Sequence, residues 1–174
     1  MSWMSGYTLL VALGASLDLS GPTGAFAGAM AKDPGGFYGI PWASKLAERQ
    51  DLVQVESGDA IQSYELKKGP PRLGEAQVES LRFVTYKGKF ARATIRYRGD
   101  RSHAQILAYL ESQFGAADRS PGSMMRGLNQ QFNWRGQDTE VNLTYEAFQG
   151  RGFVFIESRV LAPRFNDVLP EHNF

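Results

Sequence analysis

Apolar and polar side chains alternate along several short segments in the second half of the chain, as they do in β-strands with one buried face. In ARATIRYR, Ala93, Ile95 and Tyr97 alternate with threonine and arginine side chains. Other segments are rich in the β-branched and aromatic residues that strands favour. The pattern predicts about five strands, at residues 81–86, 91–98, 130–134, 139–145 and 153–161.

A second periodicity, with apolar residues three and four positions apart, predicts a long helix at about residues 102–114. Its apolar stripe consists of Ile106, Leu107, Leu110 and Phe114. Ser102 is the expected N-cap and Gly115 the expected stop. A shorter helix is expected at about residues 43–50. Strands joined by short connections and interrupted by one long helix indicate an α+β fold with an antiparallel sheet.

The loop of the hairpin that joins the first two predicted strands decides which side chains are buried, because a one-residue slip moves every side chain to the other face. A two-residue loop would place Phe83 opposite Arg92, which mixes apolar and charged residues on one face. A three-residue loop at 87–89 instead places Phe83 opposite Ala93. We therefore predict the three-residue loop, with a buried face made of Leu81, Phe83, Ala91, Ala93, Ile95 and Tyr97.

The opposite face of this hairpin is rich in arginine and aromatic side chains. Residues 82–101 carry seven basic side chains and a single acidic one, Asp100. Guanidinium groups make forked contacts with phosphate or carboxylate, and aromatic rings add stacking surface. The candidate partner-binding residues are therefore Tyr86, Phe90, Arg92, Arg96 and Arg98.

Two other interpretations of this face stay open. Glu140 and Glu157, on neighbouring predicted strands, can pair with the arginines across the sheet, in which case the charges belong to a solvated scaffold. Alternatively, Val84, Tyr86 and Phe90 either lie beneath another segment or stay exposed and mediate self-association.

The N-terminal segment has the pattern of a signal peptide. The first 31 residues contain no lysine or arginine, and an apolar run of 11 residues at 7–17 is too short to span a bilayer. Two A-x-A patterns place the expected cleavage after Ala31, which we prefer, or after Ala27. The alternative is a retained segment that is flexible or docks on the core. We expect a signal peptide at 1–31, a linker at 32–36 and one α+β domain at 37–174.

Composition argues against several classes of function. The chain of 174 residues has a formal net charge of +1, so no overall field marks a nucleic-acid binder. The absence of cysteine removes disulfides, thiol nucleophiles and cysteine metal sites. The two histidines, His103 and His172, lack zinc-binding spacing, and His103 is expected on the exposed first turn of the helix. No phosphate loop or nucleophile elbow is present, so we expect no cofactor and no metal.

Three stretches of the sequence share a recognisable pattern: FYGIPW at 37–42, LGEAQVESLRFVTYKGKFARATIRYRG at 73–99, and a late W…VNLTY…GFVFIES. Together they resemble a family of small exported bacterial proteins whose mature part opens F-x-G-I-x-W-G and continues with a G-K-F hairpin, a helix and two closing strands. In this chain Ala43 replaces the glycine usual after Trp42. The resemblance covers most of residues 37–159, implies an exported domain of this fold, and transfers no functional residues.

Three further features have both a structural and a functional interpretation. Residues 118–131, with Met124 and Met125, are the best candidate for a mobile functional loop, although methionines more often fill cores. Trp42 and Trp134 are interpreted as core anchors rather than as stacking platforms for a ligand.

The function expected from these observations is binding or scaffolding in the periplasm or outside the cell, and not catalysis. The partner would be a protein or an anionic component of the cell envelope, and not a nucleic acid; after processing the chain would not span the membrane. The alternative is a small envelope-acting hydrolase with an unidentified carboxylate site. A pocket lined by carboxylates and His103 would favour the hydrolase, whereas an open basic sheet face would favour the binding domain.

Overall fold

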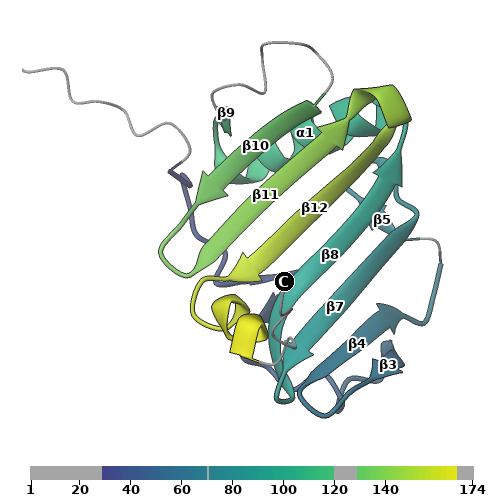
Figure 1. Ribbon diagram of the computed structural model, residues 1–174, viewed down its shortest axis with the longest axis vertical. Coiled ribbons are helices and arrows are strands. Elements are labelled where there is room, and N and C mark those ends of the chain that lie inside the picture. Colours follow the sequence, from purple (N-terminus) through teal and green to yellow (C-terminus); the bar gives the residue numbers. More distant parts are fainter. Residues whose placement is uncertain (1–28, 70, 120–128, 168–174) are drawn as a thin grey trace, which may run out of the picture.

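The fold of the chain is built on one antiparallel sheet of eight strands (Figure 1). The computed structural model describes residues 29–69, 71–119 and 129–167. A long helix, α1 (Asp100–Phe114), lies against one face of the sheet, and a short 3-10 helix, η2 (Ala162–Asp167), packs at one end of the other face. The predicted α+β fold with an antiparallel sheet is confirmed.

Every neighbouring pair of strands in the main sheet is antiparallel. In order across the sheet, the strands are β3 (Leu52–Ser57), β4 (Ile61–Leu66), β7 (Ser80–Tyr86), β8 (Lys89–Arg98), β12 (Arg151–Ser158), β11 (Thr139–Glu146), β10 (Asn129–Arg135) and β9 (Asp118–Arg119). Five of them correspond to the predicted strands, so the predicted number was too small. The strand β3 was not predicted; it lies at the edge of the sheet, and Leu52 is its only buried residue.

Three small elements complete the described structure. Two short hairpins are formed by β1 (Gly36–Phe37) with β2 (Ile40–Pro41), and by β5 (Arg72–Leu73) with β6 (Ala76–Gln77). A 3-10 turn, η1 (Ala147–Gln149), joins β11 to β12. Within the described residues, no helix combines the length and the apolar character that crossing a bilayer requires.

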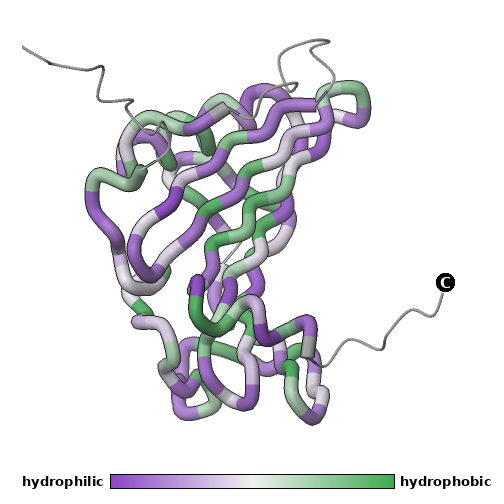
Figure 2. Tube along the Cα trace, turned by 60° about the vertical axis from the view of Figure 1, so that its left-hand side comes forward, coloured by the Kyte–Doolittle hydropathy of each residue, from purple (hydrophilic) through white to green (hydrophobic). Residues whose placement is uncertain are grey.

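The hydrophobic core lies between the sheet and α1. Ile106, Leu110 and Phe114 are buried, as the predicted apolar stripe requires, while Leu107 is half-buried at its margin. Trp134 is fully buried, and its indole N–H donates to the carbonyl oxygen of Gly115 at 2.8 Å, just beyond the end of the helix. Figure 2 shows the alternation of hydrophobic and hydrophilic residues along the long strands, which gives the sheet its apolar face toward α1.

The helix begins two residues earlier than predicted. Gly99 is its N-cap and provides no side chain for capping, so the predicted role of Ser102 is wrong. Asp100 instead places a negative charge in the first turn, where the helix dipole favours it. The predicted stop is confirmed: Gly115 is the C-cap, and its φ of 92° lies outside the right-handed helical region, so the helix ends there.

The predicted short helix at 43–50 is wrong, because the backbone at its start pairs with β8 instead. The Ala43 N–H donates to the Phe90 carbonyl at 2.9 Å, and the Phe90 N–H donates to the Ser44 carbonyl at 2.8 Å. Ala43 also has a φ of 66°, in the left-handed region that a right-handed helix excludes. These residues therefore form turns that attach the N-terminal segment to the start of β8.

The hairpin of β7 and β8 turns on two residues, so the predicted three-residue loop is wrong. Tyr86 pairs with Lys89, and Lys87 and Gly88 both have positive φ, 49° and 76°, as a type I′ turn requires. Phe83 nevertheless pairs with Ala93, as predicted. The register shifts between Val84 and Thr85, because a β-bulge inserts one extra residue in β8 and restores the predicted pairing beyond it.

The bulge also reverses the predicted faces of two residues, Phe90 and Ala91. Phe90, predicted on the arginine face, is fully buried in the main core, with its ring 4.8 Å from Trp42 and 5.8 Å from Phe83. Ala91, predicted in that core, packs in a second cluster with Ala162 and Phe165 of η2. The extra residue reverses the alternation of side chains on one side of the bulge. A prediction that assumes strict alternation therefore places these side chains on the wrong face.

The N-terminal residues that the structure describes bond directly to the body of the domain. The Met30 N–H donates to the backbone carbonyl of Arg135 at the end of β10, and the Ala31 N–H donates to the backbone carbonyl of Phe114 at the end of α1. The Asp33 carboxylate accepts hydrogen bonds from the backbone N–H groups of Asp138 at 2.6 Å and Thr139 at 3.0 Å, and from the Thr139 hydroxyl at 2.6 Å. The apolar run at 7–17 and the cleavage position after Ala27 lie outside the described residues.

Replacing Ala43 with glycine should stabilise the domain. Ala43 is exposed and has positive φ, which costs a residue with a Cβ about 1–2 kcal/mol. Glycine removes that cost but adds freedom to the unfolded chain, so the free energy of unfolding of Ala43→Gly should rise by about 0.5–1 kcal/mol in urea denaturation. The converse substitution Gly88→Ala, also at positive φ and with open space around it, should lower it by a similar amount. Equal stability of both variants and wild type would contradict this explanation.

Asp33 should make the stability of the domain depend on pH. Burial by itself raises the pKa of this carboxyl, but hydrogen bonds from Thr139, Gly35 and Asp138 outweigh burial and lower it. A lowered folded-state pKa contributes stability above the unfolded value of about 3.9, and this contribution is lost as pH falls through the folded value. Asp33→Asn should therefore be less stable than wild type by about 1–2 kcal/mol at neutral pH. The difference should shrink as the pH falls below about 3.9 in parallel urea titrations.

Candidate functional site

The face of the sheet that carries the predicted binding residues is largely neutralised by ion pairs. Arg92 pairs with Glu157 across β8 and β12, with 2.6 Å between Nε and Oε2. Arg98 pairs with Glu79 at the same distance. Other arginines of this sheet do likewise: Arg82 with Glu65, Arg135 with Glu140 and Arg151 with Glu146. The scaffold interpretation therefore accounts for most of these charges.

The five predicted residues have different surroundings. Phe90 lies on the opposite, buried face. Tyr86 is half-buried, with its ring edge-on to Phe165 at 6.1 Å, and the Arg92 guanidinium lies 4.6 Å from the centre of the same Phe165 ring. Arg96 is exposed and makes no ion pair with any described residue. The structure thus leaves Arg96 as the one predicted arginine whose charge is not offset within the described residues.

His103 is buried, so its predicted place on an exposed first turn is wrong. Its Nε2 lies 3.3 Å from the side-chain oxygen of Gln130, which can only accept, and its Nδ1 lies 2.8 Å from the Tyr97 hydroxyl. We therefore assign the neutral tautomer with the proton on Nε2, which donates to Gln130 while Tyr97 donates to Nδ1. The position of His103 in the first turn of the helix had suggested an exposed side chain, but strands β8, β10 and β11 cover this side of α1.

Two tyrosine rings, those of Tyr97 and Tyr145, stack with the ring of this histidine. The His103 ring lies parallel to the Tyr145 ring with centroids 4.1 Å apart, and the Tyr97 and Tyr145 rings are parallel at 6.1 Å. Gly152 of β12 pairs with both tyrosines, and a Cβ there would lie 2.0 Å from Cζ of Tyr97. The glycine therefore leaves the space that the Tyr97 ring occupies.

The electrostatics of the cluster favour a structural role. Burial lowers the pKa of the His103 imidazole, and the Gln130 hydrogen bond and the Asp100 charge offset only part of that effect. Burial, together with the hydrogen bond to Asp100 and its charge, raises the pKa of Tyr145 to about 12. Every polar side-chain atom in the cluster that needs a partner has one, which is the usual state of a buried histidine in a core.

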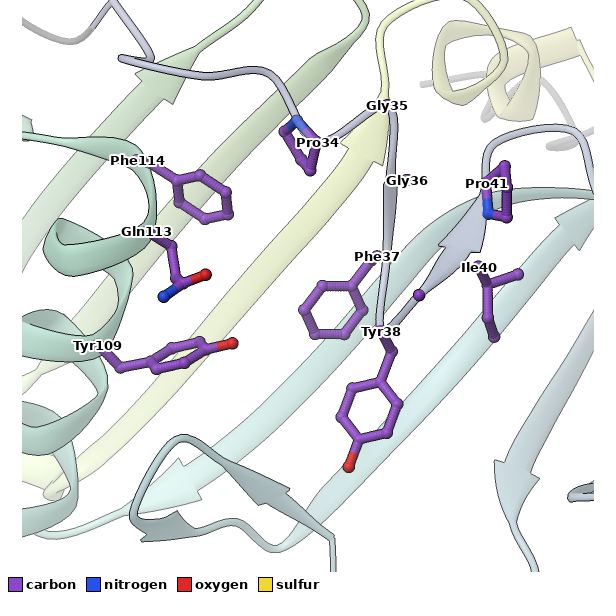
Figure 3. A pocket seen from close by; sticks show the side chains of 11 residues that line it. Pro34, Gly35, Gly36, Phe37, Tyr38, Ile40, Pro41, Tyr109, Gln113 and Phe114 are labelled. Carbon is purple, nitrogen blue, oxygen red and sulfur yellow. The ribbon is translucent and has the colours of Figure 1, made fainter.

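A cleft with a volume of about 440 Å³ lies between α1 and the β1–β2 hairpin (Figure 3). Tyr109, Gln113 and Phe114 point from α1 toward the hairpin, and Phe37 points back toward them. The residues that line it are Pro34, Gly35, Gly36, Phe37, Tyr38, Gly39, Ile40, Pro41, Tyr109, Gln113 and Phe114. None of these eleven side chains carries a charge at neutral pH.

The hairpin wall of the cleft holds an aromatic residue in an unfavourable backbone conformation. Tyr38 and Gly39 form its two-residue turn, with φ of 57° and 72°. Glycine or asparagine is favoured at such positions, so the tyrosine is held there at a conformational cost. Its side chain is 49% exposed, although the ring approaches Phe83 at 6.0 Å. The hairpin therefore presents a large aromatic ring at the mouth of the cleft.

The helix wall of the cleft packs against the turn between β5 and β6. A Cβ on Gly74, in the β5–β6 turn, would lie 2.7 Å from the Tyr109 ring, so this turn packs its backbone directly against the ring. Burial, and then the neighbouring Tyr38, raise the pKa of the Tyr109 hydroxyl, which is therefore a neutral donor and acceptor at physiological pH. The cleft thus combines fixed aromatic surface with a phenol, a carboxamide and backbone groups.

This site could not be predicted from the sequence, because its two walls lie about seventy residues apart in the chain. FYGIPW was noted as a pattern, and Tyr109 belongs to the predicted long helix, but no periodicity relates the two. The long loop proposed at 118–131 cannot be compared with the cleft, since residues 120–128 lie outside the described residues. Within the described ranges, no group of three His, Asp or Glu side chains could hold a metal ion.

Comparison of the chain with protein-family models, with curated proteins and with solved structures finds no match in any of the three.

The stability of the domain should fall as pH decreases through the range in which free histidine titrates. The pKa of His103 is lowered in the folded state, so below about pH 6.5 the unfolded chain binds a proton that the folded chain resists. We expect the free energy of unfolding to decline from about pH 7 to pH 5. In His103→Gln this part of the pH dependence should disappear, although the variant is less stable at pH 7. An unchanged pH profile in the variant would show that His103 is not its source.

Proposed function

We propose that this chain is an exported binding domain of the cell envelope, with the cleft between α1 and the β1–β2 hairpin as its ligand site. The observation that carries the proposal is a cleft of about 440 Å³ lined by aromatic rings and uncharged polar groups. This volume falls within the range of about 300–1,000 Å³ typical of small-molecule sites, and such sites combine apolar walls with a few polar groups.

The lining favours an uncharged ligand with an aromatic or apolar body. A charged group in this cleft would lose hydration without meeting an opposite charge, since the lining contains none. Tyr109 and Gln113 offer hydrogen bonds from the helix wall, and Phe37 and Phe114 offer ring surface. The arrangement fits an aromatic peptide segment or a neutral sugar better than a phosphate or a carboxylate.

The conformation of Tyr38 supports the same proposal. A residue with a Cβ at positive φ costs about 1–2 kcal/mol, and such costs are concentrated at functional sites. Asparagine or glycine would remove the cost without altering the turn, but would also remove the ring from the mouth of the cleft. A role in ligand contact explains why the tyrosine stands there.

The hydrolase alternative finds no support in the cleft. Its lining includes neither a carboxylate nor an imidazole, the side chains that most often transfer protons in hydrolases. His103 lies in the buried cluster with Tyr97 and Gln130, where its two nitrogens are already bonded. Binding is therefore the function that these residues support best.

A matched pair of probes tests the preference for an uncharged ligand. N-acetyltyrosine amide is neutral and N-acetyltyrosine is anionic, while both carry the same ring. In ligand-observed NMR we expect the neutral probe to bind more tightly, with N-acetylglucosamine as a neutral sugar in the same series. Tyr109→Ala and Gln113→Ala should each weaken binding of the neutral probe by about 3- to 10-fold, as expected for one lost hydrogen bond or ring contact.

The control variant for this experiment is Glu111→Gln, an exposed position on the same helix that does not line the cleft. It should bind the probes like wild type. Equal binding by all variants, or tighter binding of the anionic probe, would remove the cleft as the ligand site.

A further inference from the structure

The sheet face opposite α1 carries a band of side chains that take no part in its ion pairs. Phe153 and Phe155 of β12 lie at its centre, and both are half-buried. Thr144 and Arg96 are the cross-strand partners of Phe153; Asn142 and Thr94 are those of Phe155. We call these six residues the central band. It lies on the two middle strands of the sheet and on their neighbour β11, on the face turned toward the viewer in Figure 1.

Ion pairs border the central band at both ends of β12. At one end, Arg92 pairs with Glu157, and at the other, Arg151 pairs with Glu146. The same arginines hold the rings of the band: the Arg92 guanidinium lies 5.5 Å from the centre of Phe155, and that of Arg151 lies 5.7 Å from the centre of Phe153. The two phenylalanines are therefore fixed in position between borders whose charges cancel.

Arg96 is the one charged residue of the central band, and it has no acidic partner among the described residues. It is exposed and lies directly across from Phe153. A guanidinium group forms paired hydrogen bonds with a carboxylate, and these are stronger than hydrogen bonds between neutral groups. Its neighbours Thr94, Asn142 and Thr144 offer hydroxyl and carboxamide groups that suit sugar hydroxyls.

We propose that the central band binds an acidic polysaccharide whose carboxylates alternate with neutral sugar units. A carboxylate would bind Arg96, the apolar face of a sugar ring would lie on Phe153 and Phe155, and its hydroxyls would bond to the amide and hydroxyl side chains. The site lies on the face opposite the cleft, so it stands independently of the function proposed above.

The borders of the band argue against a polyphosphate chain such as single-stranded RNA. Such a chain carries a negative charge on every unit, whereas the charges of the borders cancel and the band offers a single unpaired cation, Arg96. The overall formal charge of +1 offers no compensating attraction. A peptide strand would be expected to add to a sheet edge, where backbone groups lack partners, and the central band is far from both edges.

Titration with hyaluronate oligosaccharides, in which glucuronate alternates with N-acetylglucosamine, tests the proposal directly. Isothermal calorimetry should detect binding to the folded domain, whereas any binding of N-acetylglucosamine oligomers, which lack the carboxylate, should be unaffected by Arg96→Gln. Arg96→Gln should weaken hyaluronate binding by about 10-fold or more, the loss expected for one charge-assisted contact. Phe153→Thr, which keeps strand propensity but removes the ring, should weaken it as well.

Arg98→Gln is the matched control, because it removes one arginine of the same strand that is already paired with Glu79. It should bind hyaluronate within about 3-fold of wild type, and Tyr109→Ala in the cleft should bind it unchanged. Circular dichroism confirms that each variant is folded. The proposal is overturned if wild type does not bind hyaluronate, if both arginine variants lose binding equally, or if single-stranded RNA binds more tightly.

Discussion

The β-bulge at the start of β8 determines how both faces of the sheet are built. It sends Phe90 and Arg92 to opposite faces, although two residues at this spacing normally share one. Phe90 then packs on Trp42, and its backbone groups bond to Ala43 and Ser44. These contacts attach the N-terminal segment to the core, and with it the hairpin that forms one wall of the cleft. On the other side of the sheet, the same bulge places Ala91 beneath η2.

The two faces of the sheet differ in the number of charged side chains that they carry. The face toward α1 is apolar, and the cleft at its margin contains no charged side chain. The other face carries many charges, but Arg–Glu pairs cancel most of them and leave a polar, aromatic band at the centre. A ligand on either face would therefore be selected by ring contacts and by a few directed hydrogen bonds, and only weakly by the overall field of the protein.

Buried polar groups are bonded wherever the described structure encloses them. His103 uses both ring nitrogens, Trp42 donates its indole N–H to the Thr139 hydroxyl, and Asp33 accepts from the backbone of the β10–β11 turn. Because an unbonded polar group in a core costs free energy, these bonds specify how α1 and the N-terminal segment dock on the sheet. The cluster around His103 is thus explained by folding alone, whereas the cleft and the central band are the surfaces that we propose for binding.

The sequence by itself determined the strands with one buried face, the long helix and its apolar stripe, because side-chain periodicity is a local property of the chain. It also determined that Phe83 faces Ala93, since apolar residues must share a face. Only the tertiary structure decided the bulge, the burial of His103 and the absence of a helix after Trp42. Each of these depends on hydrogen bonds or ring contacts between residues far apart in the chain, such as Ser44 with Phe90. The cleft was beyond prediction for the same reason, because its two walls meet only after α1 and the β1–β2 hairpin have docked on the same sheet.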